Sequence, residues 1–452
     1  MAENTREIVL DMLLELERGE AYSHKLMSAV LDKYNYLGMQ DKAFMKRLAE
    51  GTTERRVTLD YVLDQFSGVP VRKMKPLIRV LMRMSVYQLL YMDSIPDSAV
   101  CNEAVKLAEK RKFRNLKGFV NGVLRSIARD KEKAMLPFGK EAPKKPDAAY
   151  LSVRYSMPLW IVERWLKAYG ADTAKVMLES YLKERPTQIR CNTAKIAPEE
   201  LKKRLEAEGV TVRDSVYLPY AFEISGYDYL EKITAFEEGL FQVQDISSML
   251  VAACAAPEKD AFCLDVCAAP GGKSMHLSDL LGDSGMVEAR DLTEYKIGLI
   301  EDNIYRSGKA NVRAKQWDAT VFDPAMEEKA DVVIADLPCS GLGVIGRKKD
   351  IKYRMEEGSL EELAKLQREI LTVVHRYVKQ GGILVYSTCT VNPAENEENV
   401  RWFLEQFDFE PVSLDDTLCE ELHGETTAQG YLQLLPGIHK SDGFFISKFR
   451  RR

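Results

Sequence analysis

The sequence of 452 residues contains no uninterrupted apolar run near the roughly 20 residues that a membrane-spanning helix needs. Residues 1–7 are polar and lack the apolar core of a secretory signal. The eight cysteines are too scattered for a disulfide scaffold, and none of their spacings gives the C-x-x-C pair of a zinc site. We therefore expect a cytoplasmic protein that has globular domains and neither a membrane anchor nor a metal.

Charge is unevenly distributed along the chain. Residues 1–150 hold 27 Lys and Arg against 20 Asp and Glu, whereas the whole chain holds 64 against 69. A basic N-terminal third favours a polyanionic partner such as RNA. An ordinary solvated surface explains the same surplus equally well.

Residues 1–135 are predicted to form an all-helical domain. The first helix has an apolar stripe, and Pro76 opens a helix that is apolar on nearly every side. Lys110–Lys117 is a basic cluster that suits phosphate binding, or else a plain solvated loop. Residues 131–146, rich in Pro and Lys, are predicted to be a linker.

The next part of the chain, residues 150–235, is predicted to be a small α+β segment. We expect helices near 158–168, 172–183 and 198–208, and strands at 187–191 and 211–216.

From 236 to 452, short apolar segments alternate with helices, which predicts a parallel, doubly wound α/β sheet. Strands are expected at 262–266, 286–289, 332–335 and 383–386. Ser359, with Glu362 three residues later, predicts a capped helix start, and Gly381 predicts the end of that helix. Residues 443–449 are expected to form a last edge or hairpin strand.

The loop after the first strand, residues 265–274, opens a helix and is rich in small residues. It is neither the G-x-G-x-x-G nor the phosphate-loop motif, which disfavours a nicotinamide-dependent enzyme. A ligand can approach backbone N–H groups there, and the helix N-terminus favours an anionic group. Asp291 after the next strand suits ribose hydroxyls, and Asp318 after the third suits an adenine amine, although either acid alone is as readily a surface charge. Together with Asp336, the predicted holders of a nucleoside cofactor with an amino-acid tail are Cys267, Ala268, Ala269, Pro270, Gly271, Gly272, Lys273, Asp291 and Asp318.

Two cysteines, Cys339 and Cys389, follow the fourth and fifth strands, in D-L-P-C-S-G-L-G and S-T-C-T. Neighbouring parallel strands bring both to one crevice, although small buried thiols are a common alternative. A thiolate that adds to carbon 6 of a cytosine makes carbon 5 nucleophilic toward a methyl donor. Asp336 can then hydrogen-bond the base and Lys273 can polarise its carbonyl edge. The base must be single-stranded or leave its stack.

These motifs, with Phe241–Asp245 and Ser441–Phe445, resemble the RNA cytosine-5 methyltransferase family over 240–452. The resemblance implies a class I, Rossmann-like fold and S-adenosyl-L-methionine as cofactor. It also implies that Cys389 is the nucleophile, that Cys339 serves product release, and that Asp336 and Lys273 contact the cytosine. The N-terminal helices are similar to the NusB-type RNA-binding fold, as in the bacterial 16S rRNA methyltransferase B (Sun/Fmu) type.

In that type, residues 150–235 correspond to a small RNA-binding segment. Two residues depart from the family pattern: Lys296 stands where Arg is common, and Trp317 replaces a usual Gly. Both leave details of the adenine pocket open.

We therefore expect three domains, at 1–135, 150–235 and 236–452, in a monomeric enzyme that methylates carbon 5 of a cytosine in 16S ribosomal RNA of the small subunit. Two alternatives stay open. The first is the same reaction on transfer RNA, because the choice of RNA depends on the shape of the protein surface, which the sequence does not give. A non-catalytic RNA-binding or antitermination factor is the other, although a scaffold has no use for both cysteines.

Overall fold

A computed structural model describes residues 4–19, 23–139, 143, 145–282 and 284–452. The chain divides into two compact units, and each is described by itself. The helical unit comprises Met1–Leu182 and Ile345–Arg354, and the sheet unit comprises Lys183–Val344 and Met355–Arg452. Within the described residues, no helix is both long and apolar enough to cross a bilayer.

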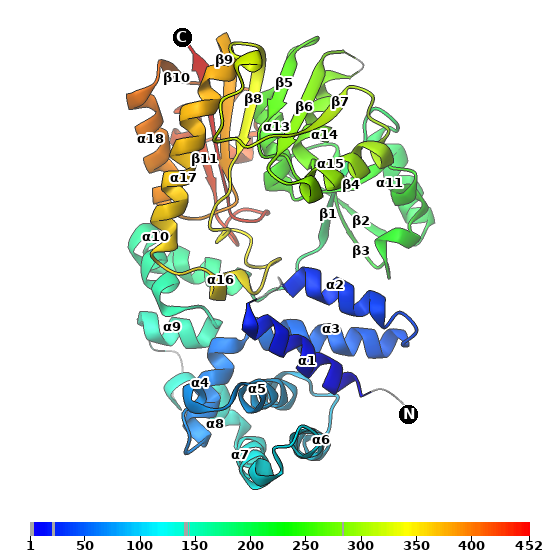
Figure 1. The fold of residues 1–452 in the computed structure, drawn as a ribbon, viewed down its shortest axis with the longest axis vertical. Helices are drawn as coiled ribbons and strands as arrows, with labels where there is room; N and C mark the ends of the chain where they lie inside the picture. Colours follow the sequence, from blue (N-terminus) through cyan, green and yellow to red (C-terminus); the bar gives the residue numbers. More distant parts are fainter. Residues whose placement is uncertain (1–3, 20–22, 140–142, 144, 283) are drawn as a thin grey trace. The chain divides into compact units, whose positions relative to one another are not determined.

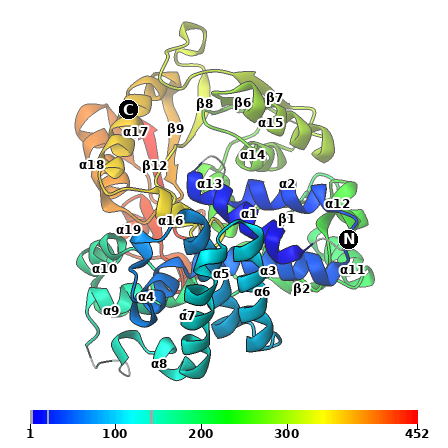
Figure 2. The same cartoon turned by 60° about the horizontal axis from the view of Figure 1, so that its bottom comes forward.

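The helical unit is built around α5 (Pro76–Tyr91), which is buried along most of its length, as its apolar sequence predicts. Its neighbours α1, α3, α4, α6 and α7 pack around it (Figure 2). The other helices of the unit are α1 (Thr5–Arg18), α2 (Ser23–Lys33), α3 (Met39–Glu54), α4 (Arg56–Phe66), α6 (Asp97–Lys110), α7 (Lys117–Arg129), α8 (Lys131–Met135), α9 (Ala148–Tyr155), α10 (Leu159–Ser180) and α16 (Ile351–Arg354).

Two segments of this unit differ in detail from the sequence prediction. The predicted linker 131–146 contains the short helix α8 and a 3₁₀ turn at Pro137–Gly139, while its residues 140–142 and 144 lie outside the described residues. The two helices expected near 158–168 and 172–183 form the single element α10. Gly170, whose φ is 77°, kinks this element where the prediction placed the break.

The sheet unit begins with a small antiparallel sheet in the order β2-β3-β1-β4. β1 coincides with the predicted strand 187–191, whereas the strand expected at 211–216 is shorter and ends at Asp214. This part contains β1 (Thr187–Cys191), α11 (Pro198–Ala207), β2 (Thr211–Asp214), β3 (Ala221–Ser225), α12 (Thr234–Glu237) and β4 (Phe241–Val243).

The main sheet has the order β10-β12-β9-β8-β5-β6-β7, with β11 also paired to β12. Strands β5 to β9 run parallel, and β12 is antiparallel to β9, so the sheet is mixed. The strands are β5 (Phe262–Asp265), β6 (Met286–Asp291), β7 (Val312–Gln316), β8 (Ala330–Asp336), β9 (Val378–Thr388), β10 (Phe409–Pro411), β11 (Tyr431–Leu434) and β12 (Phe444–Arg451).

Helices cover both faces of this sheet (Figure 1). One face packs against α13, α14 and α15, and the other against α17 and α18. Alternation along β5 shows the division, because Cys263 belongs to the first core and Leu264 to the second. The helices are α13 (Ile246–Ala255), α14 (Gly272–Leu281), α15 (Glu294–Ser307), α17 (Ser359–Val374), α18 (Glu397–Gln406) and α19 (Glu425–Ala428).

Two predictions for this part were wrong, and a third holds in one of its two alternatives. Ser359 is the first helical residue of α17, and its N-cap is Gly358, which makes no side-chain capping bond. The helix ends at Val374, and Gly381 lies inside β9 with φ 76°, where a glycine relieves a strained backbone. Of the segment 443–449, residues 444–449 belong to β12, which forms an antiparallel hairpin with β11, one of the two predicted alternatives, and which is not an edge because it also pairs with β9 and β10.

Candidate active site and cofactor site

The predicted cofactor loop joins β5 to α14 at the carboxyl ends of the parallel strands. The Ala268 N–H donates to the Arg290 carbonyl at 2.8 Å, which fixes the loop to β6. Gly271 has φ 102°, a conformation that favours glycine, and it begins α14 without a side-chain cap. The first N–H groups of α14 thus have no capping side chain, which suits an anionic group.

A second glycine-rich segment follows β8 and crosses the boundary between the two units. Gly341–Gly346 reads G-x-G-x-x-G, so this motif is present in the chain, although not at the first strand. The segment follows β8, and turns instead of a helix follow it. It therefore lacks the strand–turn–helix geometry of a dinucleotide site.

Asp291, at the end of β6, is buried and is tied to the cofactor loop. Its carboxylate accepts hydrogen bonds from the Ala269 N–H at 2.9 Å and from the Leu292 N–H at 2.8 Å. Lys296, the departure from the family pattern, forms an ion pair with it at 2.8 Å. The lysine thus supplies a cation to the same carboxylate.

Asp318 lies two residues beyond β7 and is exposed. Its Oδ1 accepts from the Thr320 N–H at 2.9 Å and from Thr320 Oγ1 at 2.7 Å. The neighbouring Trp317 donates from its indole to the Val321 carbonyl at 2.7 Å, and the Lys315 Nζ lies 4.7 Å from its ring centroid. The tryptophan is thus fixed beside Asp318.

Lys273 and Asp336 form an ion pair between α14 and the end of β8. Lys273 Nζ lies 2.7 Å from Asp336 Oδ2, and Ser387 Oγ donates to Asp336 Oδ1 at 2.9 Å. Burial lowers the pKa of Lys273, but Asp336 and then Asp265 raise it by more, so its pKa lies above the ordinary value and the ammonium stays charged. Burial also raises the pKa of Asp265 itself to about 7.

The two predicted cysteines meet. Cys339 Sγ and Cys389 Sγ are 3.2 Å apart. The hydrogen bond to Cys389, and then burial, raise the pKa of Cys339 well above that of an ordinary thiol, which favours the protonated form of Cys339, a form able to donate to the other sulfur. Lys273 interacts electrostatically with Cys389, and a nearby cation favours a thiolate.

A buried carboxylate holds the Cys339 loop. Glu395 is fully buried, and each of its oxygens accepts two hydrogen bonds. Oε2 accepts from the Ser340 N–H at 2.9 Å and from Gln367 Nε2 at 3.0 Å. Oε1 accepts from Ser340 Oγ at 2.5 Å and from Asn392 Nδ2 at 2.9 Å. The donors come from the loop after β8, from α17 and from the loop after β9, so one side chain joins the segments around Cys339.

Further contacts complete this frame. Gln367 Nε2 also donates to the Pro338 carbonyl at 2.9 Å, so both neighbours of the cysteine are held. The Gly343 N–H donates to the Cys389 carbonyl at 3.1 Å. A Cβ at Gly343 would lie 1.9 Å from the Gly443 carbonyl oxygen and 2.9 Å from the Cys389 oxygen, so only glycine fits there.

The structure thus brings Lys273, Asp336, Cys339 and Cys389 together, and it ties Asp291 to the glycine loop. The Cys267 side chain packs into the sheet core on the α17 side, which leaves its backbone for a ligand. Sequence reasoning missed Glu395 and its partners. The polar run 392–399, directly after the strand that carries the second cysteine, was the available signal.

Comparison with known proteins assigns the family. A sequence model described as 16S rRNA methyltransferase RsmB/F matches residues 252–450, a NusB family model matches 3–129, and a ferredoxin-like domain model of RsmF/B-like methyltransferases matches 157–227. The chain is 37% identical to the probable ribosomal RNA small subunit methyltransferase B of Bacillus subtilis, over 99% of both chains. The chain belongs to the RsmB/F methyltransferase family.

Other relatives agree with this assignment. Ribosomal RNA small subunit methyltransferase B of Escherichia coli is 32% identical over 97% of this chain and 96% of its own. The crystal structure of PH0851 covers 100% of both chains with a TM-score of 0.82 at 26% identity. That of NSun6 from Pyrococcus horikoshii with SFG covers 65% of this chain and 98% of its own, with a TM-score of 0.57 at 25% identity.

The RsmB/F family and the fold confirm the predicted architecture, with NusB-like helices, a ferredoxin-like segment and a Rossmann-like sheet. They also confirm that the chain is an S-adenosyl-L-methionine-dependent methyltransferase. The residues at the sheet edge fit this cofactor. Leu292, next to Asp291, is 54% exposed at the end of β6, although it is a large apolar residue, and it offers a surface for an adenine face. Gly271 and Gly272 would hold the amino-acid tail, and Asp291 the ribose.

Proposed function

We propose that this member of the RsmB/F family methylates carbon 5 of a cytosine in 16S ribosomal RNA through a covalent bond from Cys389 to the base. The relatives that cover nearly the whole chain are named for methylation of small-subunit ribosomal RNA. The observation that carries the chemistry is the pair of thiols, 3.2 Å apart, beside the Lys273–Asp336 ion pair.

The side chains divide the reaction between them. The Cys389 thiolate adds to carbon 6, and the electron pair of the carbon 5–carbon 6 double bond moves toward carbon 5. S-Adenosylmethionine supplies the methyl group that carbon 5 takes up. Asp336 and Lys273 face the polar edge of the ring and stabilise the charge that develops there. Loss of the carbon 5 proton to a base then restores the double bond as the bond from sulfur to carbon 6 breaks.

Cys339 is assigned to this last step. Because its raised pKa keeps it protonated, it donates a hydrogen bond to the Cys389 sulfur and stabilises the departing thiolate. Without that donor, sulfur leaves more slowly and the enzyme stays attached to its product.

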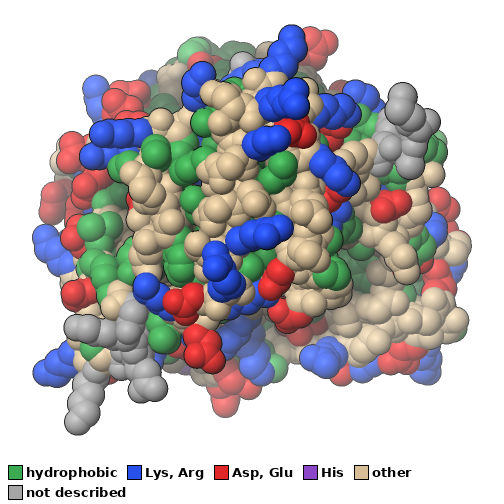
Figure 3. Space-filling view, turned by 90° about the horizontal axis from the view of Figure 1, so that it is seen from below, with side chains coloured by type: hydrophobic (Ala, Val, Ile, Leu, Met, Phe, Trp, Pro, Cys, Tyr) green, Lys and Arg blue, Asp and Glu red, His purple; other side chains and the backbone are tan. Residues whose placement is uncertain are grey.

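The RNA also needs a binding surface. Of the predicted basic cluster, Lys110 pairs with Glu7 at 2.6 Å, and Arg111 pairs with Glu7 and Asp11. Lys112, Arg114 and Lys117 are exposed, although Arg114 and Lys117 each pair with Glu109, at 3.9 and 3.4 Å. Figure 3 shows Lys and Arg side chains spread over this face among uncharged, apolar and acidic ones. Such a surface suits RNA backbone contacts distributed over several phosphates.

The test is transfer of labelled methyl to unmodified 16S RNA, with mapping of 5-methylcytosine. We expect Cys389→Ala to give neither product nor adduct, and Cys339→Ala to leave RNA covalently attached on a denaturing gel. Normal turnover by both variants would refute the mechanism. Label in transfer RNA but not in 16S RNA would keep the mechanism and change the substrate, whereas a chain that binds RNA and never transfers methyl would be a non-catalytic factor.

A further inference from the structure

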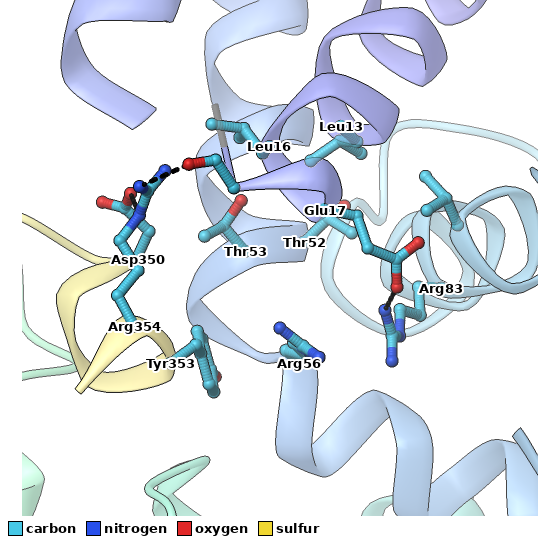
Figure 4. A pocket seen from close by; sticks show the side chains of 12 residues that line it. Leu13, Leu16, Glu17, Thr52, Thr53, Arg56, Arg83, Asp350, Tyr353 and Arg354 are labelled. Atoms are coloured by element: carbon cyan, nitrogen blue, oxygen red, sulfur yellow. Dashed lines mark hydrogen bonds and ion pairs between the residues drawn. The ribbon is translucent and has the colours of Figure 1, made fainter. Parts of the chain in front are cut away.

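A cavity of about 400 Å³ is lined by residues of the helical unit alone, and neither the two cysteines nor the cofactor loop contributes to its walls (Figure 4). Its walls come from α1, α3, α5, the start of α4 and the segment that contains α16. Cavities of this order hold small organic ligands. Nothing in the proposed chemistry uses it.

One cation at this cavity, Arg56, forms no ion pair with any described residue, although Asp60 and Glu17 attract it from a distance. Arg83 is held by Asp60 at 2.5 Å and by Glu17 at 3.0 Å. Arg56 lies over the Tyr353 ring, 5.1 Å from its centroid (Figure 4), and within the described residues it makes no hydrogen bond or ion pair. Burial, and then the repulsion from Arg83, lower the pKa of Arg56. A guanidinium remains charged under such conditions, so an anion placed beside Arg56 would be strongly favoured.

The rest of the cavity suits a flat, partly apolar body. Leu13, Leu16 and Val80 supply apolar surface. The Thr52 and Thr53 hydroxyls donate to carbonyls of their own helix at 2.6 and 2.9 Å, so each oxygen keeps a lone pair toward a ligand. A phosphate attached to a nucleobase has both features that these walls recognise.

One wall belongs to the segment that follows the Cys339 loop along the chain. Asp350 accepts from the Ser23 N–H at 3.0 Å and from Ser23 Oγ at 2.5 Å, which anchors this segment to α2. Arg354, from the same segment, pairs with Asp350 at 2.9 Å and also lines the cavity. The site therefore exists only when residues 345–354 are docked onto the helices.

We propose that this cavity binds one nucleotide unit, with its phosphate on Arg56 and its base against Leu13, Leu16 and Val80. A nucleotide in single-stranded RNA is the occupant we favour, and this choice of source rests on the proposed function. The recognition chemistry is the same for a free nucleoside monophosphate.

The test measures binding of the full chain to a labelled, unstructured single-stranded RNA, without methyl donor, by fluorescence anisotropy. Arg56→Ala should weaken binding about tenfold or more, because a buried charged hydrogen bond is lost. The slope of affinity against salt should fall by about one phosphate contact. Arg55→Ala is the matched control, because Arg55 lies over the Tyr91 ring at 5.0 Å and does not line the cavity, and it should change affinity less than twofold.

Competition identifies the source of the nucleotide. Weak competition by CMP and a clear Arg56→Ala loss with RNA support a strand nucleotide, whereas tight CMP binding that Arg56→Ala abolishes supports a free one. Equal affinity of Arg56→Ala and the unmodified chain for both ligands would overturn the proposal, as would an equal loss in Arg55→Ala. Arg56→Lys, which keeps the charge, should retain part of the affinity and guards against misfolding. Because the assay needs no methyl transfer, an RNA-binding chain without activity would refute the proposed function and leave this site intact.

Discussion

Replacing Glu395 by Gln should displace the loop that contains Cys339, while every side chain proposed to take part in the reaction stays unchanged. Glu395 is fully buried and accepts four hydrogen bonds, two on each oxygen. An amide keeps one of these oxygens and replaces the other with an NH₂ group. If the amide nitrogen takes the place of Oε2, it faces two donors that have lost their acceptor, the Ser340 N–H and Gln367 Nε2. If it takes the place of Oε1, Asn392 Nδ2 loses its acceptor, whereas the Ser340 hydroxyl can turn and accept from the amide.

The magnitude follows from the number of bonds lost. A buried donor without an acceptor costs about 1–3 kcal/mol, so the two orientations of the amide cost about 1–3 and about 2–6 kcal/mol. The loop can reduce this cost by moving Ser340 away from residue 395, and such a movement separates Cys339 from Cys389. We therefore expect turnover to fall by one to several orders of magnitude while cofactor affinity stays nearly constant, since Glu395 has no contact with the glycine loop.

Two measurements separate this effect from general destabilisation. The first is accumulation of the RNA–protein adduct, which should rise as it does in Cys339→Ala. The second is the rate of diamide-induced disulfide formation between Cys339 and Cys389, followed by mass spectrometry. This rate requires the two sulfur atoms to meet and is independent of any RNA. Glu398→Gln, an exposed position on α18, is the control and should match the unmodified chain. Unchanged turnover and unchanged cross-linking in Glu395→Gln would refute the reasoning.

Two other predictions concern packing and protonation. Gly343→Ala should inactivate the enzyme, because its Cβ would collide with the Gly443 carbonyl, whereas Gly358→Ala, which meets nothing within 4 Å, should be neutral; equal methylation rates would contradict this. Lys352 is buried and donates to the Glu54 and Ser156 carbonyls at 2.9 and 2.6 Å, and burial lowers its pKa to about 7. Because an unfolded lysine titrates near ~10.4, the unfolded chain binds more protons between these values, and stability should rise with pH across that window. Urea unfolding at pH 7 and 9 should show a gain on the order of 2 kcal/mol that Lys352→Met lacks; an equal gain in the variant would contradict this assignment.

Two sequence signals account for most of the correct predictions: the periodicity of apolar residues, and the position of polar residues directly after predicted strands. The apolar run after Pro76 predicts a central helix, and α5 is that helix. Cys339 and Cys389 each end a strand, and because β8 and β9 are parallel neighbours, both thiols reach the same edge. The residues that meet at such an edge can be predicted from the sequence, because the carboxyl ends of parallel strands lie at the same edge of a sheet.

The errors arose where several local signals compete. Ser359 has the composition of a cap, yet the chain already turns helical at Gly358, so the serine side chain caps nothing. Gly381 resembles a helix end because glycine adopts positive φ easily, and Gly381 does adopt a positive φ, but at a position inside β9. A single residue type cannot distinguish these uses, because the deciding partner is distant in sequence.

Glu395 and Lys352 show the same limit at the level of function. Each is a charged residue in a polar stretch, which composition alone assigns to the surface. Each is buried because distant backbone and side-chain groups complete its hydrogen bonds: Ser340 and Gln367 for Glu395, and the Glu54 and Ser156 carbonyls for Lys352. Glu395 holds the loop that contains Cys339 in the sheet unit, and Lys352 lies further along the same stretch of chain, in the helical unit. The thiol that we assign to product release has both of its sequence neighbours fixed in this way, because Gln367 holds Pro338 and Glu395 holds Ser340. Its position is accordingly set by long-range hydrogen bonds, not by local propensity.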